Sequence, residues 1–221
     1  MRRVGMAALI AVSAASVATA ATTVPLPRPA PLRSMAPAAM GSRDAQHQLI
    51  DRINAYFTNM QTLVGDFVQI GPDGRRSEGQ FYIQKPGKVR FEYNPPTPID
   101  VIADGQTVVV RNRLLATQDP FPLSQTPLRL LLSDRLDLSK DTHIVSVISS
   151  ETSIIVMIEE RQLLIGTNRM KLVFGAKDFQ LRQWSVTDPQ GYETTVSIFN
   201  LDSTKKLDPN LFKISYDRML Q

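Results

Sequence analysis

The sequence predicts a mainly β protein with some α: a curved antiparallel sheet of about ten or eleven strands with one apolar face. Short segments in which apolar and polar residues alternate recur between residues 64 and 201, a pattern typical of half-buried strands. Turn-forming pairs such as Pro86-Gly87 and Asp104-Gly105 separate these segments. Short strands that follow one another directly favour an antiparallel meander.

The strand segments can be assigned individually from their alternation and from the turns that bound them. The turn Asp188-Pro189-Gln190-Gly191 joins two of the longest. Strands are expected at Val64–Ile70, Ser77–Lys85, Val89–Tyr93, Ile99–Ala103, Gln106–Arg111, His143–Ser149, Ile154–Glu159, Arg169–Phe174, Leu181–Thr187, Tyr192–Leu201 and Phe212–Tyr216.

Two hairpins make definite register predictions. A three-residue loop that pairs Lys85 with Val89 brings the apolar residues of both strands to one face, whereas a two-residue loop would put them on opposite faces. At Asp104-Gly105 a two-residue loop is expected, which pairs Val101 with Val108 and Ile99 with Val110.

Two stretches have helical character. Apolar residues recur at helical spacing in Asp44–Gln61, and in Phe121–Asp134 a short helix is expected with Thr126 as N-cap and Pro127 at its first position. Such apolar faces must pack on something, so both helices are candidates to cover the sheet. The covering, lid-forming residues are expected to be Leu49, Ile53, Phe57, Leu128, Leu131 and Leu132.

The apolar face of the sheet has two possible roles. It can form a filled core under the helices, or a large sheet around few helical residues can leave a cavity. The candidate cavity-lining residues are Phe67, Phe81, Ile83, Val89, Phe91, Tyr93, Ile99, Val101, Val108, Val110, Trp184 and Ile198. Lys85 ends this apolar row, where it can donate to carbonyls, bind an anionic headgroup at a cavity mouth, or extend to water as a rim lysine.

The N-terminus has the features of a secretory signal peptide. Arg2 and Arg3 precede an apolar run from Val4 to Val17, and Ala18-Thr19-Ala20 is a small-residue cleavage site. The run is about 14 residues long, short of the roughly 20 that span a bilayer. Residues 1–20 are therefore expected to be removed by cleavage after Ala20, and the mature protein to be exported, with the periplasm favoured over secretion.

Residues 21–43 form a Pro-rich tail that is expected to be flexible, and residues 44–221 a single domain. A membrane- or partner-tethering role for the tail remains open. Five of the 25 basic residues and none of the 21 acidic residues precede Asp44, so the domain carries 20 basic and 21 acidic residues. A near-neutral domain gives no support to nucleic-acid binding.

The chain has no cysteine, which excludes disulfides, thiolate metal sites, a cysteine nucleophile and lipid attachment to an N-terminal cysteine. Its two histidines, His47 and His143, lie in a helix and at the start of a strand, and no nucleophile elbow, phosphate-binding loop or metal-spaced ligand set accompanies them. The acids Asp66, Glu78 and Glu92 show no catalytic spacing. An enzyme is not expected, and neither is a cofactor or metal.

An ordered set of segments resembles the outer-membrane lipoprotein carrier family, the LolA-like periplasmic chaperones. The segments are DFVQI after the first helix, GQFYIQKPGKVRFEY, PIDVIADGQTVVV, TPLRLLL and QWSVTDPQGYETTVSIFNL, within residues 44–216. The resemblance implies an unclosed antiparallel half-barrel of about eleven strands with a helical lid. It further implies a monomeric carrier that holds the acyl chains of a lipoprotein, taken from an inner-membrane ABC-type extraction complex and delivered to an outer-membrane receptor.

The chain departs from the family at one position. Well-known members have an arginine before the proline of the Pro86-Gly87 hairpin, where it bonds to the lid backbone and favours the closed, empty state. Here the residue is Lys85, a point charge in place of a planar fork. A different function class also remains open: a periplasmic regulator that senses lipids or lipoproteins on the same fold.

Overall fold

The computed structural model describes residues 43–162 and 166–215. The signal peptide expected at residues 1–20 lies outside them, as does the Pro-rich tail of residues 21–43 except for Arg43.

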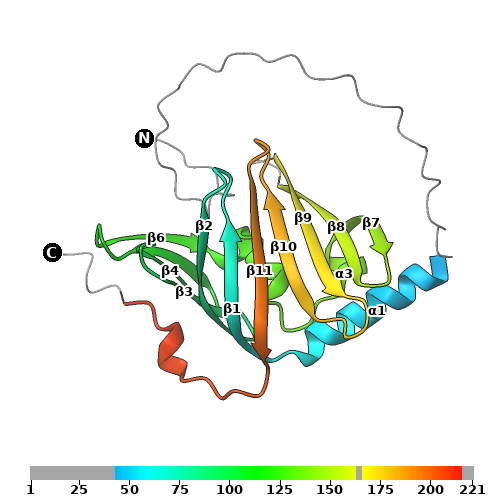
Figure 1. The fold of residues 1–221 in the computed structure, drawn as a ribbon, viewed down its shortest axis with the longest axis horizontal. Coiled ribbons are helices and arrows are strands. Elements are labelled where there is room, and N and C mark those ends of the chain that lie inside the picture. Colours follow the sequence, from blue (N-terminus) through cyan, green and yellow to red (C-terminus); the bar gives the residue numbers. More distant parts are fainter. Residues whose placement is uncertain (1–42, 163–165, 216–221) are drawn as a thin grey trace, which may run out of the picture.

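The described chain forms one antiparallel sheet of eleven strands, which confirms the predicted mainly β, unclosed architecture (Figure 1). The first and last strands pair in the middle of the sheet, so one wing runs from β1 to β6 and the other from β11 back to β7. The free edges are β6 and β7. The strands are β1 (Thr62–Ile70), β2 (Arg76–Gln84), β3 (Lys88–Tyr93), β4 (Ile99–Asp104), β5 (Thr107–Asn112), β6 (Thr117–Pro122), β7 (His143–Ser149), β8 (Ser153–Gln162), β9 (Gly166–Gly175), β10 (Leu181–Thr187) and β11 (Glu193–Asp202).

Helix α1 and the helical turns between β6 and β7 lie on the concave side of the sheet (Figure 1). α1 (Arg43–Asn59) leads into β1, as predicted. The connection from β6 to β7 passes from one free edge to the other and carries η2 (Leu123–Gln125), α2 (Leu128–Leu131) and α3 (Leu138–Asp141). We call α1 together with this connection the lid.

Within the lid, the predicted N-cap is wrong. The side chain of Thr126 accepts no hydrogen bond from a helix amide; its buried hydroxyl instead donates to the carbonyl of Leu123, because Thr126 closes the preceding turn η2. A threonine between two helical turns can serve either one, and the sequence does not say which.

Two strand predictions also fail. β6 was missed because it contains Pro120 and Pro122, which are tolerated here because β6 is an edge strand with one side free of ladder partners. The expected final strand Phe212–Tyr216 is wrong: Pro209–Phe212 forms the 3-10 helix η3, whose first turn is capped by the side chain of Asp208, and Tyr216 lies outside the described residues.

The first hairpin has the predicted three-residue loop, but it begins one residue earlier, at Lys85. Ile83 therefore pairs with Val89 and Phe81 with Phe91, and the apolar sets share a face as expected. In the second hairpin the two-residue loop is Gly105-Gln106, so the predicted pairing of Val101 with Val108 and of Ile99 with Val110 is wrong.

The second loop is displaced because Asp104 ends β4 and turns the chain with its side chain. Its carboxylate accepts hydrogen bonds from the backbone amides of Gln106 and Thr107, and Gly105 takes a φ of 114°. Val101 consequently pairs with Val110, and Ala103 with Val108. The shift is by an even number of positions, so the same side chains still face the concave side.

Glycine lets aromatic rings pack across neighbouring strands of the first wing. Gly79 lies between Phe67 and Tyr93 in the sheet, and the two rings meet edge to face with centroids 4.9 Å apart. A Cβ atom at Gly79 would lie 1.9 Å from the carbonyl oxygen of Glu92. The close strand contact at this position therefore requires glycine.

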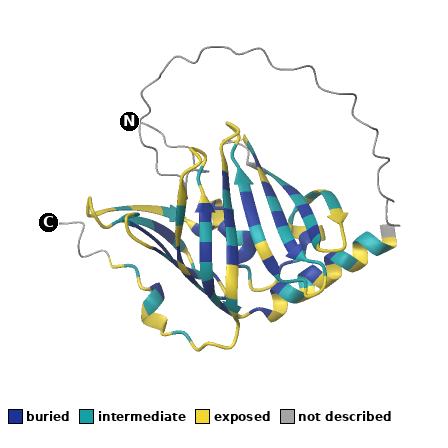
Figure 2. Ribbon diagram, in the orientation of Figure 1, coloured by how far each residue is buried: buried dark blue, intermediate teal, exposed yellow. Residues whose placement is uncertain are grey.

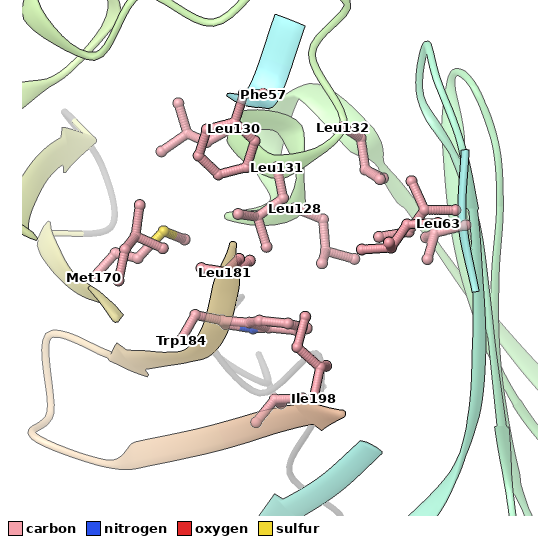
Figure 3. Packing of buried hydrophobic residues seen from close by; sticks show 14 of the residues in the cluster. Phe57, Leu63, Leu128, Leu130, Leu131, Leu132, Met170, Leu181, Trp184 and Ile198 are labelled. Carbon is pink, nitrogen blue, oxygen red and sulfur yellow. The ribbon is translucent and has the colours of Figure 1, made fainter. Parts of the chain in front are cut away.

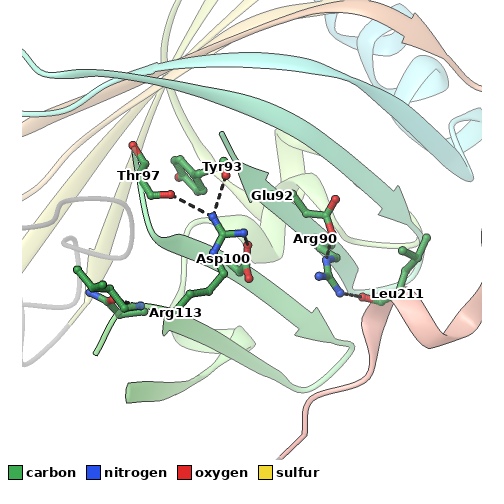
Figure 4. A network of polar contacts seen from close by, with 9 residues as sticks. Arg90, Glu92, Tyr93, Thr97, Asp100, Arg113 and Leu211 are labelled. Carbon is green, nitrogen blue, oxygen red and sulfur yellow. Dashed lines mark hydrogen bonds and ion pairs between the residues drawn. The ribbon is translucent and has the colours of Figure 1, made fainter. Parts of the chain in front are cut away.

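The C-terminal segment covers part of the convex face. Helix η3 contacts β3 and β4, and its Phe212 is buried, as is Ile102 on the outward side of β4. Arg90 donates to the carbonyl of Leu211 and is ion-paired with Glu92 (Figure 4). Part of the convex face of this wing is thus covered by the chain itself, whereas the concave face carries the residues predicted to line the site.

Candidate functional site

The concave face of the sheet and the lid form one buried apolar cluster, which we call the interior cluster (Figures 2 and 3). On β1 and β3, for example, every second residue is buried, as expected for strands with one face on a core. The cluster contains all twelve predicted cavity-lining residues: Phe67, Phe81, Ile83, Val89, Phe91, Tyr93, Ile99, Val101, Val108, Trp184 and Ile198 are buried, and Val110 is partly buried against them.

The predicted lid residues meet this wall directly. Ile53, Phe57, Leu128, Leu131 and Leu132 are buried in the same cluster, and Leu49 packs on it from a partly exposed position. In Figure 3 the labelled leucines of the lid face Trp184 and Ile198 of the sheet. The lid is therefore a structural part of the core in this state of the protein.

The prediction covered the first wing far better than the second. β8 contributes Ile154, Val156 and Ile158 to the interior cluster, and β9 contributes Met170, Leu172 and Phe174. The alternation of IIVMI was visible in the sequence, but nothing in the sequence placed β8 and β9 beside the lid. Phe174 meets the ring of Phe57 edge to face at 5.8 Å, so the second wing also holds α1.

Lys85 ties the sheet to the lid. It is only 6% exposed, and its Nζ donates to the carbonyl of Phe57 in α1 at 2.6 Å, with the ammonium 5.2 Å from the centre of the Phe57 ring. Two residues on, the amide of Gly87 donates to the carbonyl of Leu132 at the end of α2. Of the roles that the sequence left open for Lys85, the structure shows carbonyl donation, so lysine makes the lid contact that the resemblance assigns to arginine.

Burial shifts the ionisation of Lys85. Desolvation lowers the pKa of its ammonium from the ordinary 10.5 to about 8, and the carboxylate of Asp134 opposes the shift. An arginine at this position would remain charged at any pH that the protein survives.

A second tie was not predicted. Arg129 of α2 forms an ion pair with Glu160 of β8, and its Nε lies 2.8 Å from the carboxylate. Lys85 fastens the lid to the first wing and Arg129 fastens it to the second. Partners 31 residues apart give no local signal in a sequence.

A groove of about 550 Å³ runs between the second half of α1, the turn from β9 to β10 and the end of β11. Its lining includes Tyr56, Phe179 and Leu201, together with Met60 and Leu63 of the interior cluster. The groove thus reaches the interior cluster from the surface without passing through the sheet.

The part of the chain that the structure describes holds no cluster of three or more His, Asp or Glu residues that could bind a metal ion. In the same part, no helix is both long and apolar enough to cross a membrane.

A sequence profile of the family described as outer membrane lipoprotein carrier protein LolA matches residues 58–215. The chain belongs to the LolA family. The match covers the whole sheet and the connection from β6 to β7, but only the last two residues of α1. This confirms the resemblance inferred from the ordered segments.

Curated relatives of the LolA family are distant but cover most of the chain. The outer-membrane lipoprotein carrier protein of Methylococcus capsulatus is 26% identical over 173 residues, which covers 74% of this chain and 82% of the relative. That of Bordetella avium is 26% identical over 185 residues, 80% of this chain and 85% of the relative. LolA proteins are carriers and not enzymes, so the expectation that this chain is not an enzyme is confirmed.

Solved structures match most of the chain at low identity and with TM-scores below 0.5. A LolA superfamily protein from Nitrosomonas europaea is 10% identical with a TM-score of 0.40, and the likeness covers 75% of this chain and 97% of that one. The MucA/MucB complex of Pseudomonas aeruginosa matches at 14% identity and a TM-score of 0.42, over 76% of this chain and 61% of that one. Such likenesses decide nothing about function.

The titration of Lys85 should be visible in the pH dependence of stability. Between about pH 8 and 10.5 the folded state has lost the Lys85 proton and the unfolded state still holds it, so the free energy of unfolding rises with pH, by at most about 3 kcal/mol. Below pH 8 both states hold the proton, so Lys85 no longer makes the free energy of unfolding change with pH. Lys85→Arg removes the ionisation and leaves the other titrating groups in place.

Urea unfolding of the two proteins at a series of pH values measures this effect. The wild-type free energy of unfolding, minus that of Lys85→Arg, should increase from pH 8 to pH 10.5. A difference that stays constant over this range would show that Lys85 is not desolvated.

Proposed function

We propose that this protein is a periplasmic carrier that holds the acyl chains of lipoproteins in its interior and moves them from the inner to the outer membrane. The observation that carries the proposal is the shared burial of lid and wall. The concave face is apolar on both wings, and it is covered by α1 and short helical turns, which Lys85 and Arg129 fasten to the sheet by polar contacts. Such a cover can be exchanged for a ligand of the same chemistry.

The energies of the two occupants are comparable. Burying one leucine side chain is worth about 1.5–3 kcal/mol, so Leu128, Leu130, Leu131 and Leu132 together contribute roughly 6–12 kcal/mol to lid closure. Burying a 16-carbon acyl chain is worth about 12 kcal/mol at 0.8 kcal/mol per methylene. On these figures the burial of an acyl chain offsets the lost burial of the lid leucines, and its release lets the lid close again.

The proposed partners follow from the names of the relatives and from the resemblance. The cargo is an acylated lipoprotein, the donor an inner-membrane ABC-type extraction complex, and the acceptor an outer-membrane lipoprotein receptor. Export by the signal peptide of residues 1–20, cleaved after Ala20, delivers the carrier to the periplasm. A monomer suffices, because one interior takes the chains of one cargo molecule.

A charge placed in the wall should abolish acyl binding. Val101 is buried in the interior cluster, so Val101→Glu would put an unpaired carboxylate against an acyl chain, and we expect the affinity for a fluorescent fatty acyl probe to fall about tenfold or more. The matched control is Val145→Glu, because Val145 is 54% exposed on β7. Circular dichroism checks that both variants retain the sheet. Equal binding by the two folded variants would refute the interior as the acyl site.

Depletion of the protein in the source bacterium distinguishes a lipoprotein carrier from a lipid- or lipoprotein-sensing regulator. If the protein is a carrier, lipoproteins accumulate in the inner membrane when it is depleted, as fractionation would show. Correct sorting combined with altered stress signalling would instead support a lipid-sensing regulator on the same fold.

A further inference from the structure

The interior wall is apolar along most of its length but polar at one end. Strand registers place Asn168 of β9, Thr194 of β11 and Gln69 of β1 toward the upper end of the sheet in Figure 1, and all three are buried. Side chains alternate along a strand, so Asn168 shares the inward face of β9 with Met170 and Leu172. The interior therefore has an apolar length and a polar end, as an amphiphile does.

Asn168 differs from its polar neighbours in what it contacts. Gln69 accepts a hydrogen bond from the hydroxyl of Tyr93 at 2.6 Å. Asn168 is 7% exposed, and its Oδ1 is buried with no hydrogen-bond partner among the described residues. A buried carbonyl without a donor is costly, and such groups in native proteins call for an explanation.

The surroundings of Asn168 indicate what kind of donor it lacks. Glu160 lies directly opposite it in the β8–β9 register, and the carboxylate of Glu160 is already occupied by Arg129 of the lid. The local charge is thus balanced, and an uncharged N–H suits the unpaired oxygen better than an ammonium does. Two residues along the same face, Met170 begins the apolar wall; Figure 3 shows Met170 facing the lid leucines.

We propose that Asn168 forms a subsite for the amide N–H of an amide-linked acyl chain, with the hydrocarbon lying along the wall from Met170 inward. The inference rests on the proposed function and adds a substrate preference to it: acyl amides over acyl esters. An ester has the same shape and carbonyl but no N–H, so it leaves the oxygen of Asn168 unpaired. The proposed hydrogen bond lies beside the Arg129–Glu160 ion pair, and a ligand would enter there by moving α2 away from the sheet.

Two probes that differ by one group test the preference: the methyl ester of N-palmitoylglycine and the methyl ester of O-palmitoylglycolate, in which oxygen replaces N–H. Displacement of a fluorescent apolar dye from the full mature chain measures both affinities. We expect the wild type to bind the amide about tenfold more tightly than the ester, the effect of one buried hydrogen bond. Asn168→Leu should reduce that ratio to about one by weakening amide binding alone.

The matched control is Thr194→Val, which removes a buried polar group at the same end of the interior from a different strand. It should keep the wild-type ratio. Equal affinity of the wild type for both probes would overturn the inference while leaving the carrier function intact, and so would an unchanged ratio in Asn168→Leu. Failure of both probes to bind the wild type at all would overturn the proposed function, and the inference with it.

Discussion

The structure depends on one constraint: without a ligand, the concave face of the sheet and the lid are buried by each other. The sheet has eleven strands, and the apolar faces of both wings pack on the same lid. The lid segments α2 and α3 have four residues each, too few to be stable helices alone. Their order comes from the leucines that pack on the wall.

Polar contacts set where the lid rests and how it can leave. Lys85 and Gly87, in the hairpin between β2 and β3, hold the first wing to α1 and α2. Arg129 holds α2 to Glu160 of β8 in the second wing. Each contact is worth far less than the apolar burial it orients. The lid is thus positioned by hydrogen bonds and an ion pair but retained by hydrophobic contact, the same interaction that an acyl chain offers.

The sequence predicted what depends on local pattern. Alternation assigned the inward faces of β2 and β3, and every proposed wall and lid residue lies in the interior cluster. The β4–β5 pairing was wrong because Asp104 turns the chain with its side chain, a detail that leaves the alternation unchanged. β6 was missed because its prolines read as loop, although an edge strand tolerates them. Arg129–Glu160 and the unpaired oxygen of Asn168 arise from tertiary contacts, which no local pattern contains.

The central claim is that a ligand and the lid compete for one apolar surface. Hydrogen exchange of the backbone amides, measured with and without a saturating fatty acyl ligand, tests it most directly. The account predicts faster exchange at Gly87, whose amide bonds to Leu132, and at Leu132 itself in the loaded protein, with β1 and β11 unchanged. Unchanged or slower exchange at these two amides on loading would contradict the account, because the ligand would then lie elsewhere.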